Sequence, residues 1–243
     1  MPIARIQKLI SQAGICSRRK AEVLILEGKV FLNNKLAHIG DKADLCLDEI
    51  VVNGYKIPKS NSYNVILLNK PSGVISSCSD KFGRKTVLSF LPSNLKQGMH
   101  PIGRLDYESR GAILLTNNGD LTLKLTHPRY KHTKSYRVTI EGIPSKKTIC
   151  DWSEGIEIEG KKSLKSVVKL IKVFKSTSIL KIDLQEGRNR QIRKTADILG
   201  HKVLDLQRIS IAHIKLNRLV EGQWRHIKKE EWEPLLKTIQ GYN

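Results

Sequence analysis

Hydrophobic residues follow a helical period at the start of the chain. Between Ile6 and Ala13 the apolar positions fall three or four residues apart, and Gly14 follows, which predicts a short amphipathic helix ended by glycine. Ser17 is a favourable N-cap residue for a second helix, which we expect to end at Gly28.

Strand patterns dominate most of the remaining sequence. Short apolar segments at 29–32 and 49–52 precede Asn-Asn and Asn-Gly turns, which is typical of a small antiparallel sheet. Mainly apolar runs at 65–69 and 112–115 predict buried strands. Residues 134–140 alternate between apolar and polar side chains, which predicts a strand with its tyrosine on the apolar face.

Weaker patterns predict further elements. We expect a β-hairpin formed by 165–174 and 178–185, and a helix that runs to Leu199 with Gly200 as its stop. The other predicted elements are a turn at 118–119, a short helix at 121–125, strand-like pieces at 206–209, 214–216 and 222–225, and a C-terminal helix at 230–239.

A polar, turn-prone segment divides this pattern in two. Residues 58–62 read Pro-Lys-Ser-Asn-Ser and separate the helical start from the strand-rich remainder. A chain of 243 residues has room for two domains with separate cores. We therefore expect one domain at 1–60 and a second at 61–243.

The charge balance narrows the class of partner. Lys and Arg number 43 against 23 Asp and Glu, so the formal net charge is +20. A chain this basic most often binds a polyanion, and nucleic acid is the leading case. The first 60 residues hold ten basic and six acidic side chains, so most of the excess positive charge belongs to the second domain.

The cysteines and histidines indicate neither a metal centre nor a redox motif. The four cysteines, at positions 16, 46, 78 and 150, form no Cys-x-x-Cys pair, and the seven histidines are scattered. With no signal peptide or long apolar segment in the sequence, we expect a reducing, cytoplasmic environment.

One acidic residue is a candidate for chemistry. Asp106 lies between Arg104 and Arg110, directly before the predicted strand at 112–115, with a glycine on each side of the group. Glycine allows tight turns, so the carboxylate could be held on a short loop against a buried strand. The same pattern also suits a surface ion pair or a turn former, and the local sequence leaves both interpretations open.

Four motifs together resemble a known family. Residues 103–111 read Gly-Arg-Leu-Asp-x-x-Ser-x-Gly and continue into Leu-Leu-Thr-Asn-x-Gly. Asn-Lys-Pro-x-Gly is at 69–73, Lys-x-Tyr-x-Val at 134–138, and Glu-Gly-Arg-x-x-Gln-Ile-Arg at 186–193. This set is similar to the bacterial ribosomal-RNA pseudouridine synthases of the RsuA/RluB type, and the resemblance extends from residue 3 to about residue 237.

Residues 3–57 resemble the S4 RNA-binding domain. The resemblance rests on Ser-Arg-Arg-Lys at 17–20 between the two predicted helices and on Gly-x-Val-x-Leu-Asn at 28–33. Three cations at a helix start oppose the helix dipole, so local folding does not require them, whereas a phosphate backbone would suit them. A helical hairpin with solvated charges is the alternative.

The two resemblances imply an α+β fold. A small N-terminal S4-like domain of two helices and a β-hairpin would be joined to a larger, mixed and mainly antiparallel sheet with flanking helices. The larger part would be the pseudouridine synthase catalytic domain.

The resemblance also implies an activity and three catalytic residues. The activity is isomerisation of a specific uridine to pseudouridine in ribosomal RNA, with 23S RNA slightly favoured over 16S, and with no cofactor or metal. Asp106 corresponds to the catalytic carboxylate, Tyr136 to the residue that packs on the target base, and Arg193 to the cation that pairs with the Asp. The carboxylate could attack C1′ or remove the 2′ proton, and Tyr136 on an apolar face also suits a core residue.

Candidate RNA contacts come from both domains. Arg104 could stack in the space left by a flipped base, and Lys194 stands where the family has a second arginine, which keeps the charge but loses the bidentate fork. A non-catalytic, rRNA-binding or ribosome-assembly module is the alternative function, and we expect a monomer. The predicted RNA-binding residues are Arg18, Arg19, Lys20, Arg104, Arg188, Arg190 and Lys194.

Overall fold

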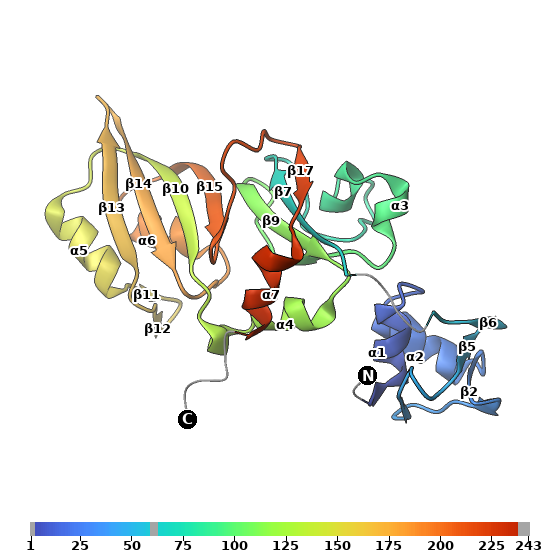
Figure 1. Ribbon diagram of the computed structural model, residues 1–243. Coiled ribbons are helices and arrows are strands. Elements are labelled where there is room, and N and C mark those ends of the chain that lie inside the picture. The colour runs from blue at the N-terminus through green and yellow to red at the C-terminus, as the bar shows by residue number, and fades with distance from the viewer. Residues whose placement is uncertain (1–2, 59–62, 238–243) are drawn as a thin grey trace.

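Two helices pack against a small sheet at the N-terminal end of the chain (Figure 1). The structure is a computed structural model that describes residues 3–58 and 63–237. Ser17 caps the second helix by accepting a hydrogen bond from the Lys20 N–H, as the sequence predicts. The elements are β1 (Ala4–Arg5), α1 (Ile6–Gln12), α2 (Arg18–Leu26), β2 (Val30–Leu32), β3 (Lys35–Leu36), β4 (Lys42–Ala43), β5 (Ile50–Val52) and β6 (Tyr55–Lys56).

This N-terminal unit has a hydrophobic core of its own. The cluster of buried side chains under α1 and α2 is drawn from residues 6–57, and the strands follow the order β3-β2-β5-β6. The predicted pair of helices and the small antiparallel sheet are therefore confirmed.

A mainly antiparallel sheet of nine strands, within the described residues, forms the larger unit. Its path is β13-β14-β10-β15-β9-β7-β17, with β16 beside β15 and β8 beside β9. The strands are β7 (Val65–Lys70), β8 (His100–Ile102), β9 (Arg110–Thr116), β10 (Lys134–Glu141), β13 (Val167–Val173), β14 (Thr177–Leu184), β15 (Val203–Ile211), β16 (Ile214–Lys215) and β17 (Trp224–His226). The predicted fold class is confirmed.

Helices cover both faces of this sheet. β7 contributes Ile66 and Leu68 to the cluster that includes helices α5 and α6, and its alternate residues Val65 and Leu67 to the cluster with α4 and α7. Because both faces are buried, the strand reads as a continuous apolar run rather than an alternating one. The remaining elements are η1 (Val87–Phe90), α3 (Ser93–Lys96), α4 (Gly119–Thr126), η2 (Pro128–Tyr130), α5 (Lys146–Glu154), β11 (Glu157–Ile158), β12 (Lys161–Lys162), α6 (Gln191–Ile198) and α7 (Lys229–Lys237).

Several sequence expectations need correction in detail. Asn118 does not close a turn after β9; its side chain accepts hydrogen bonds from the Asp120 and Leu121 N–H groups and so caps α4. The strand piece predicted at 206–209 is part of the longer β15, and α5 was not predicted. Residues 59–62, most of the predicted domain boundary, and 238–239, the end of the predicted last helix, lie outside the described ranges.

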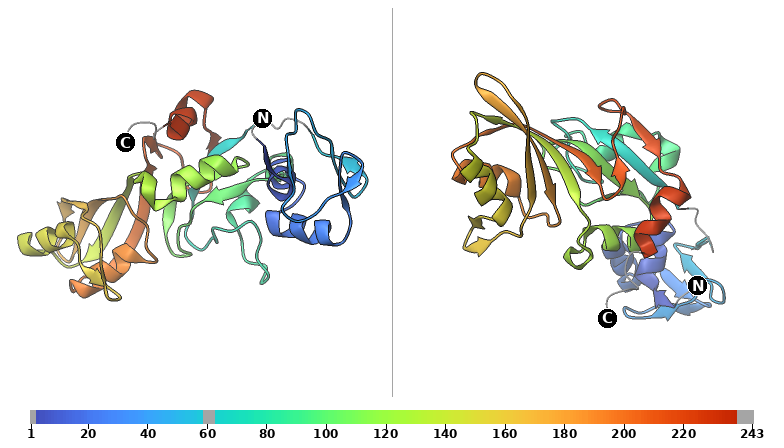
Figure 2. Two further views of the ribbon diagram at one scale, coloured as in Figure 1. Left: turned by 90° about the horizontal axis from the view of Figure 1, so that it is seen from below. Right: turned by 60° about the vertical axis from the view of Figure 1, so that its left-hand side comes forward.

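The N-terminal unit lies at the opposite end of the molecule from α5 and contacts the α4 region (Figures 1 and 2). Lys8 Nζ and Asp120 Oδ1 are 2.8 Å apart. The two units also approach closely through glycine, since a Cβ added to Gly98 would lie 3.1 Å from the Cα of Gly14. Within the described residues, no helix has the length and apolarity needed to cross a membrane.

The two halves of the large sheet meet at a short parallel pairing. β9 and β15 pair through Arg110 with Gln207 and Gly111 with Arg208. Gly111 has a φ of +106°, and a Cβ there would lie 2.2 Å from the Arg208 carbonyl oxygen. Only glycine permits this close approach of the two backbones. Arg110, which precedes Gly111, reinforces the junction by two hydrogen bonds to Asp205, of 2.7 and 2.8 Å.

We therefore expect Gly111→Ala to destabilise the protein by about 3 kcal/mol or more, since the new methyl group would overlap backbone that cannot move freely. Urea unfolding measures the change. Gly119→Ala is the matched control, because Gly119 begins α4 and has nothing within 4 Å of an added Cβ. It should be neutral or stabilising by up to about 1 kcal/mol. Equal effects of the two substitutions would contradict the packing argument.

Candidate active site

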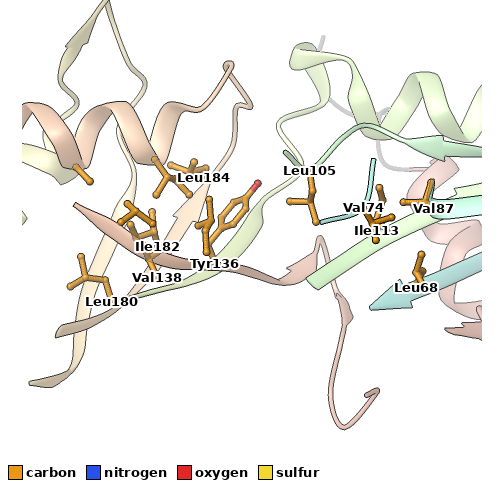
Figure 3. Packing of buried hydrophobic residues seen from close by; sticks show 14 of the residues in the cluster. Leu68, Val74, Val87, Leu105, Ile113, Tyr136, Val138, Leu180, Ile182 and Leu184 are labelled. Carbon is orange, nitrogen blue, oxygen red and sulfur yellow. The ribbon is translucent and has the colours of Figure 1, made fainter. Parts of the chain in front are cut away.

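A pocket of about 370 Å³ opens where the two halves of the sheet meet. Its wall includes the turn that carries Asp106, the start of β10, the segment at 184–192 that leads into α6, and β15. Figure 3 shows the ring of Tyr136 between Leu184 and Leu105, and all three residues line the pocket. Segments far apart in the sequence thus converge on one carboxylate.

The turn at 105–109 is held by hydrogen bonds to each of its carbonyl groups. Ser109 N–H donates to the Asp106 carbonyl at 3.1 Å, and Gly73 N–H donates to the Tyr107 carbonyl at 2.8 Å. Hydroxyl groups of Ser76 and Ser72 donate to the carbonyls of Leu105 and Glu108. Lys70 Nζ donates to the Ser109 carbonyl at 2.6 Å. The segment at 70–76 therefore fixes the backbone on which Asp106 is carried.

Lys70 is a buried cation beneath this turn. Its residue exposure is 0% although it ends an apolar strand. Its ammonium also donates to the Pro71 carbonyl at 2.8 Å and to the Tyr107 carbonyl at 3.4 Å. Burial lowers the pKa of Lys70 to about 8, while the charge of Asp106 acts in the opposite direction. The side chain thus remains mainly protonated at neutral pH and binds three carbonyl groups.

Asp106 and Tyr136 line the same pocket. The Asp106 side chain is 34% exposed, so it is open to a ligand. Tyr136 belongs to the apolar face of β10 with Val138 and Ile140, and it is 8% exposed. The ring is therefore both a core residue and part of the pocket wall, as the alternating pattern allowed.

Two arginines lie beside the Asp106 turn, and they differ in their contacts. Arg190 Nη1 is 4.0 Å from Asp106 Oδ2 and 3.5 Å from Glu108 Oε2. Arg193 instead contacts Glu108, with Nε 3.8 Å from Oε2, and its Nη2 donates to Ser109 Oγ at 3.4 Å. The ion pair of Asp106 is thus with Arg190, whereas the sequence resemblance singles out Arg193.

The other predicted RNA-binding residues separate into three groups. Arg104 is exposed and lines the pocket. Arg188 lines it too but is partly buried, and its Nη1 donates to the Lys161 carbonyl at 2.7 Å. Lys194 lies outside the pocket wall and pairs with Glu159 at 2.7 Å. The last group is at the start of α2 in the N-terminal unit, where its side chains are exposed: Arg18, Arg19 and Lys20.

Three further cations of the pocket, Lys131, Lys134 and Arg208, were not predicted as site residues. Lys134 and Arg208 line it together with Asp106, and Arg208 is 3% exposed. Burial lowers the pKa of Lys134, and the charge of Arg208 lowers it further. The sequence did contain a signal for Arg208, because it alternates with Leu206 and Ser210 on the buried face of a strand.

This arrangement suits an anionic substrate with a planar group. The carboxylate of Asp106 and the ring of Tyr136 lie among several cations, so a polyanion could bind at the rim while a flat ring stacks on the tyrosine. A carboxylate in this setting can act as a nucleophile or as a base. Among the described residues, no group of three or more His, Cys, Asp or Glu side chains is positioned to hold a metal ion.

Comparisons with known proteins point to a single family. The sequence profile described as RNA pseudouridylate synthase matches residues 64–197, and that of the S4 domain matches residues 4–42. The chain is 42% identical over 230 residues to the ribosomal large subunit pseudouridine synthase B of Bacillus subtilis (strain 168), which covers 93% of each chain.

Two further matches extend over nearly the whole chain. The dual-specificity RNA pseudouridine synthase RluF of Escherichia coli (strain K12) is 38% identical over 97% of this chain and 79% of its own. A crystal structure of a pseudouridylate synthase superposes with a TM-score of 0.70 at 25% identity, covering 95% of this chain and 99% of that one.

The buried ammonium of Lys70 makes stability depend on pH in the alkaline range. Its pKa is about 8 in the folded chain, against about 10.4 for an unperturbed lysine. Between these values the unfolded chain binds more protons than the folded chain, so the free energy of unfolding rises with pH. We expect the wild type to gain roughly 1–3 kcal/mol relative to Lys70→Met over this range.

Urea unfolding of both proteins at a series of pH values from neutral to about 10 tests this expectation, because all other titrating groups are common to the two. A difference in unfolding free energy that does not change with pH would show that the Lys70 pKa is not lowered in the folded chain.

Proposed function

The chain belongs to the RNA pseudouridylate synthase family, whose members are isomerases, and on that premise we propose that it converts a specific uridine of ribosomal RNA to pseudouridine with Asp106 as the catalytic carboxylate. The observation that carries the proposal is the rigidly held turn at 105–109, whose carboxylate shares a pocket with the ring of Tyr136.

The reaction requires one reactive group and no net redox change. The N1–C1′ glycosidic bond of uridine breaks, the uracil rotates, and its C5 atom bonds to C1′, so the product is an isomer of the substrate. Asp106 acts in its ionised form, either as the nucleophile at C1′ or as the base that removes the 2′ proton. The nearest cation is Arg190, whose Nη1 is 4.0 Å from Asp106 Oδ2.

Tyr136 and the two arginines have supporting roles in this proposal. The phenol ring of Tyr136 stacks on the flipped uracil, a contact generally worth about 1–3 kcal/mol. Arg190 neutralises Asp106 at contact distance. Arg193 is hydrogen-bonded to Ser109 of the same turn and adds positive charge near Asp106. We propose that Arg193 becomes the counter-ion of Asp106 when a bound substrate competes for Arg190. Arg104 occupies the stack that the flipped base leaves.

Large-subunit RNA is the substrate that we favour. The name of the Bacillus subtilis relative specifies the ribosomal large subunit, and the chain has the basic character that an RNA substrate requires, with a net charge of +20. We accordingly propose 23S RNA rather than 16S RNA, a monomeric enzyme, and the cytoplasm as its location, where ribosomal RNA is modified. No cofactor enters this reaction scheme.

The N-terminal unit supplies further RNA contacts in this proposal. We assign residues 1–60 to an S4-like RNA-binding domain and 61–243 to the catalytic domain, a division supported by separate hydrophobic clusters within 6–57 and from 65 onward. Arg18 lines a groove against α4 with Lys8 and His100. The exposed cations at 17–20 would bind phosphates of the RNA, as would Arg188 and Lys194 beside the catalytic pocket.

Incubation with ribosomal RNA tritiated at uridine C5 tests the activity directly, because forming the C5–C1′ bond releases that hydrogen to water. We expect release with the wild type and none above background with Asp106→Asn. The amide has nearly the same shape as the carboxylate, so RNA affinity and unfolding midpoint should remain unchanged. Failure of the wild-type protein to release tritium from 23S and 16S RNA would favour a non-catalytic RNA-binding module instead.

Arg18→Ala combined with Arg19→Ala tests the role of the N-terminal unit. Each lost phosphate contact should reduce the slope of log affinity against log salt by about 0.7–0.9, so the double variant should bind RNA more weakly and with a flatter salt dependence. Filter binding at several salt concentrations measures both quantities. Lys169→Ala with Lys172→Ala on β13 removes equal charge far from this unit and should leave the slope unchanged; equal slopes for all three proteins would contradict the assignment.

A further inference from the structure

A permanently charged side chain lies in the pocket with an unpaired donor. Arg208 on β15 is 3% exposed, and it lines the same pocket as Asp106 and Tyr136. Its Nε donates to the Ala112 carbonyl at 2.7 Å, which fixes the guanidinium group, while its Nη2 is buried and has no hydrogen-bond partner. A buried donor left unsatisfied is costly, so this one requires an explanation.

The sheet register locates Arg208 between the two groups already assigned to the reaction. In the ladder of β10 and β15 it pairs with Tyr136, and in the ladder of β9 and β15 it pairs with Gly111, shortly after the Asp106 turn. The arginine therefore belongs to the strand between the one that carries the tyrosine and the one that follows the carboxylate.

Positive charge around this position is not balanced locally. Lys134 also lines the pocket, and burial followed by the charge of Arg208 lowers the pKa of its ammonium. The neighbouring carboxylates of Asp205 and Glu221 are both bound to Arg110. The pocket wall also holds the carboxylates of Asp106 and Glu186, which lie beside Arg190 and Arg188, and no ion pair joins either to Arg208 within the described residues. A guanidinium stays protonated under all ordinary conditions, so Arg208 offers its charge to a ligand.

The depth of Arg208 favours a base over a phosphate as that ligand. Exposed cations of the same pocket, including Arg104, Lys131 and Arg190, lie where an RNA backbone can reach them. A side chain that is 3% exposed beside Tyr136 is instead positioned to meet the ring that stacks on the tyrosine. The edge of a uracil presents carbonyl oxygens, which are acceptors for guanidinium donors.

We propose that Arg208 binds the uracil carbonyl oxygens of the target nucleotide and stabilises the negative charge that develops on the base when its glycosidic bond breaks. This inference rests on the proposed function. As the N1–C1′ bond breaks, its electron pair goes to N1 and the charge spreads onto the two carbonyl oxygens. C1′ receives electrons from the Asp106 carboxylate or, after that carboxylate takes the 2′ proton, from the C2′–H bond. When C5 bonds to C1′, either the C1′–O bond to Asp106 breaks or Asp106 returns the 2′ proton to C2′, so the carboxylate is restored. The C5 proton is then lost to water and N1 is protonated.

The test varies the leaving ability of the base. A synthetic RNA fragment carries either uridine or 5-fluorouridine at the position that the wild type modifies, and single-turnover loss of that nucleoside is followed with saturating enzyme. The fluorinated base has no C5 proton to lose, so its rearranged product keeps the fluorine at C5 and adds water at C6. Fluorine withdraws electrons and stabilises a ring anion, so the fluorinated base depends less on an external positive charge.

We expect Arg208→Gln to convert the uridine RNA about 100-fold more slowly than the wild type, as for loss of one donor to a developing anion, and the fluorinated RNA about 10-fold more slowly. Arg208→Lys, which keeps a cation, should fall between the wild type and Arg208→Gln on both RNAs. The salt slope of RNA binding should not change, because no phosphate contact is removed.

Arg225→Gln is the matched control. Arg225 is a sheet arginine on β17 paired with Glu231 at 2.9 Å, away from the pocket, so this substitution should leave both conversion rates unchanged. If Arg208→Gln does not fold, as judged by its urea unfolding curve, Arg208→Lys alone carries the comparison of the two bases, and its deficit must still be smaller with 5-fluorouridine.

Three results would overturn the inference. They are conversion rates unaffected by substitution of Arg208, an equal deficit with both bases, and a flatter salt dependence of RNA binding, which would assign Arg208 to a phosphate. Each leaves the proposed function intact as long as the wild type isomerises the uridine RNA. Lack of conversion by the wild type would instead reject the proposed function itself.

Discussion

The hydrogen bonds that the segment at 70–76 makes to the turn at 105–109 are the constraint on which the candidate site depends. A short loop in front of a strand would ordinarily be mobile, because its carbonyl groups can exchange partners with water. Here each carbonyl from Leu105 to Ser109 has a partner, and a fully buried lysine binds three carbonyl groups of the surrounding backbone. Burying the Lys70 ammonium is unfavourable in itself, but its hydrogen bonds to the Tyr107 and Ser109 carbonyls hold the backbone that carries Asp106 in place.

A second constraint brings that turn to the tyrosine. The sheet consists of two antiparallel halves joined by the parallel contact of β9 with β15. Gly111 allows the two backbones to approach, and Arg110 bound to Asp205 holds them together. Because Arg208 belongs to the same junction, the fold brings a cation, a carboxylate and an aromatic ring from three separate strands or loops to one pocket. Positive charge predominates there, which suits a substrate that contributes the negative charge.

Local patterns predicted much of the fold but little of how its parts meet. The apolar run at 65–69, the alternation at 134–140 and the Ser17 cap each correspond to an observed element, because such features depend on neighbours within a few residues. Asn118 was misassigned, since an Asn-Gly pair suits a turn and a helix N-cap equally well, and the packing of Leu121 and Leu125 against the sheet decides between them. The division of the chain near residue 60 stays a prediction.

The sequence by itself determined the types of element, the basic character and the candidacy of Asp106 and Tyr136, because motifs and periodicities are local properties. Only the tertiary structure decided which charges meet. Asp106 lies beside Arg190, whereas Arg193 contacts Glu108 and Ser109. The two arginines are three residues apart, and their spacing in the sequence does not indicate which of them contacts Asp106. The tertiary structure also buries Lys70 and Arg208 among backbone carbonyls. Burial and pairing of charges arise from contacts between segments about 35 to 100 residues apart, and so depend on the whole fold.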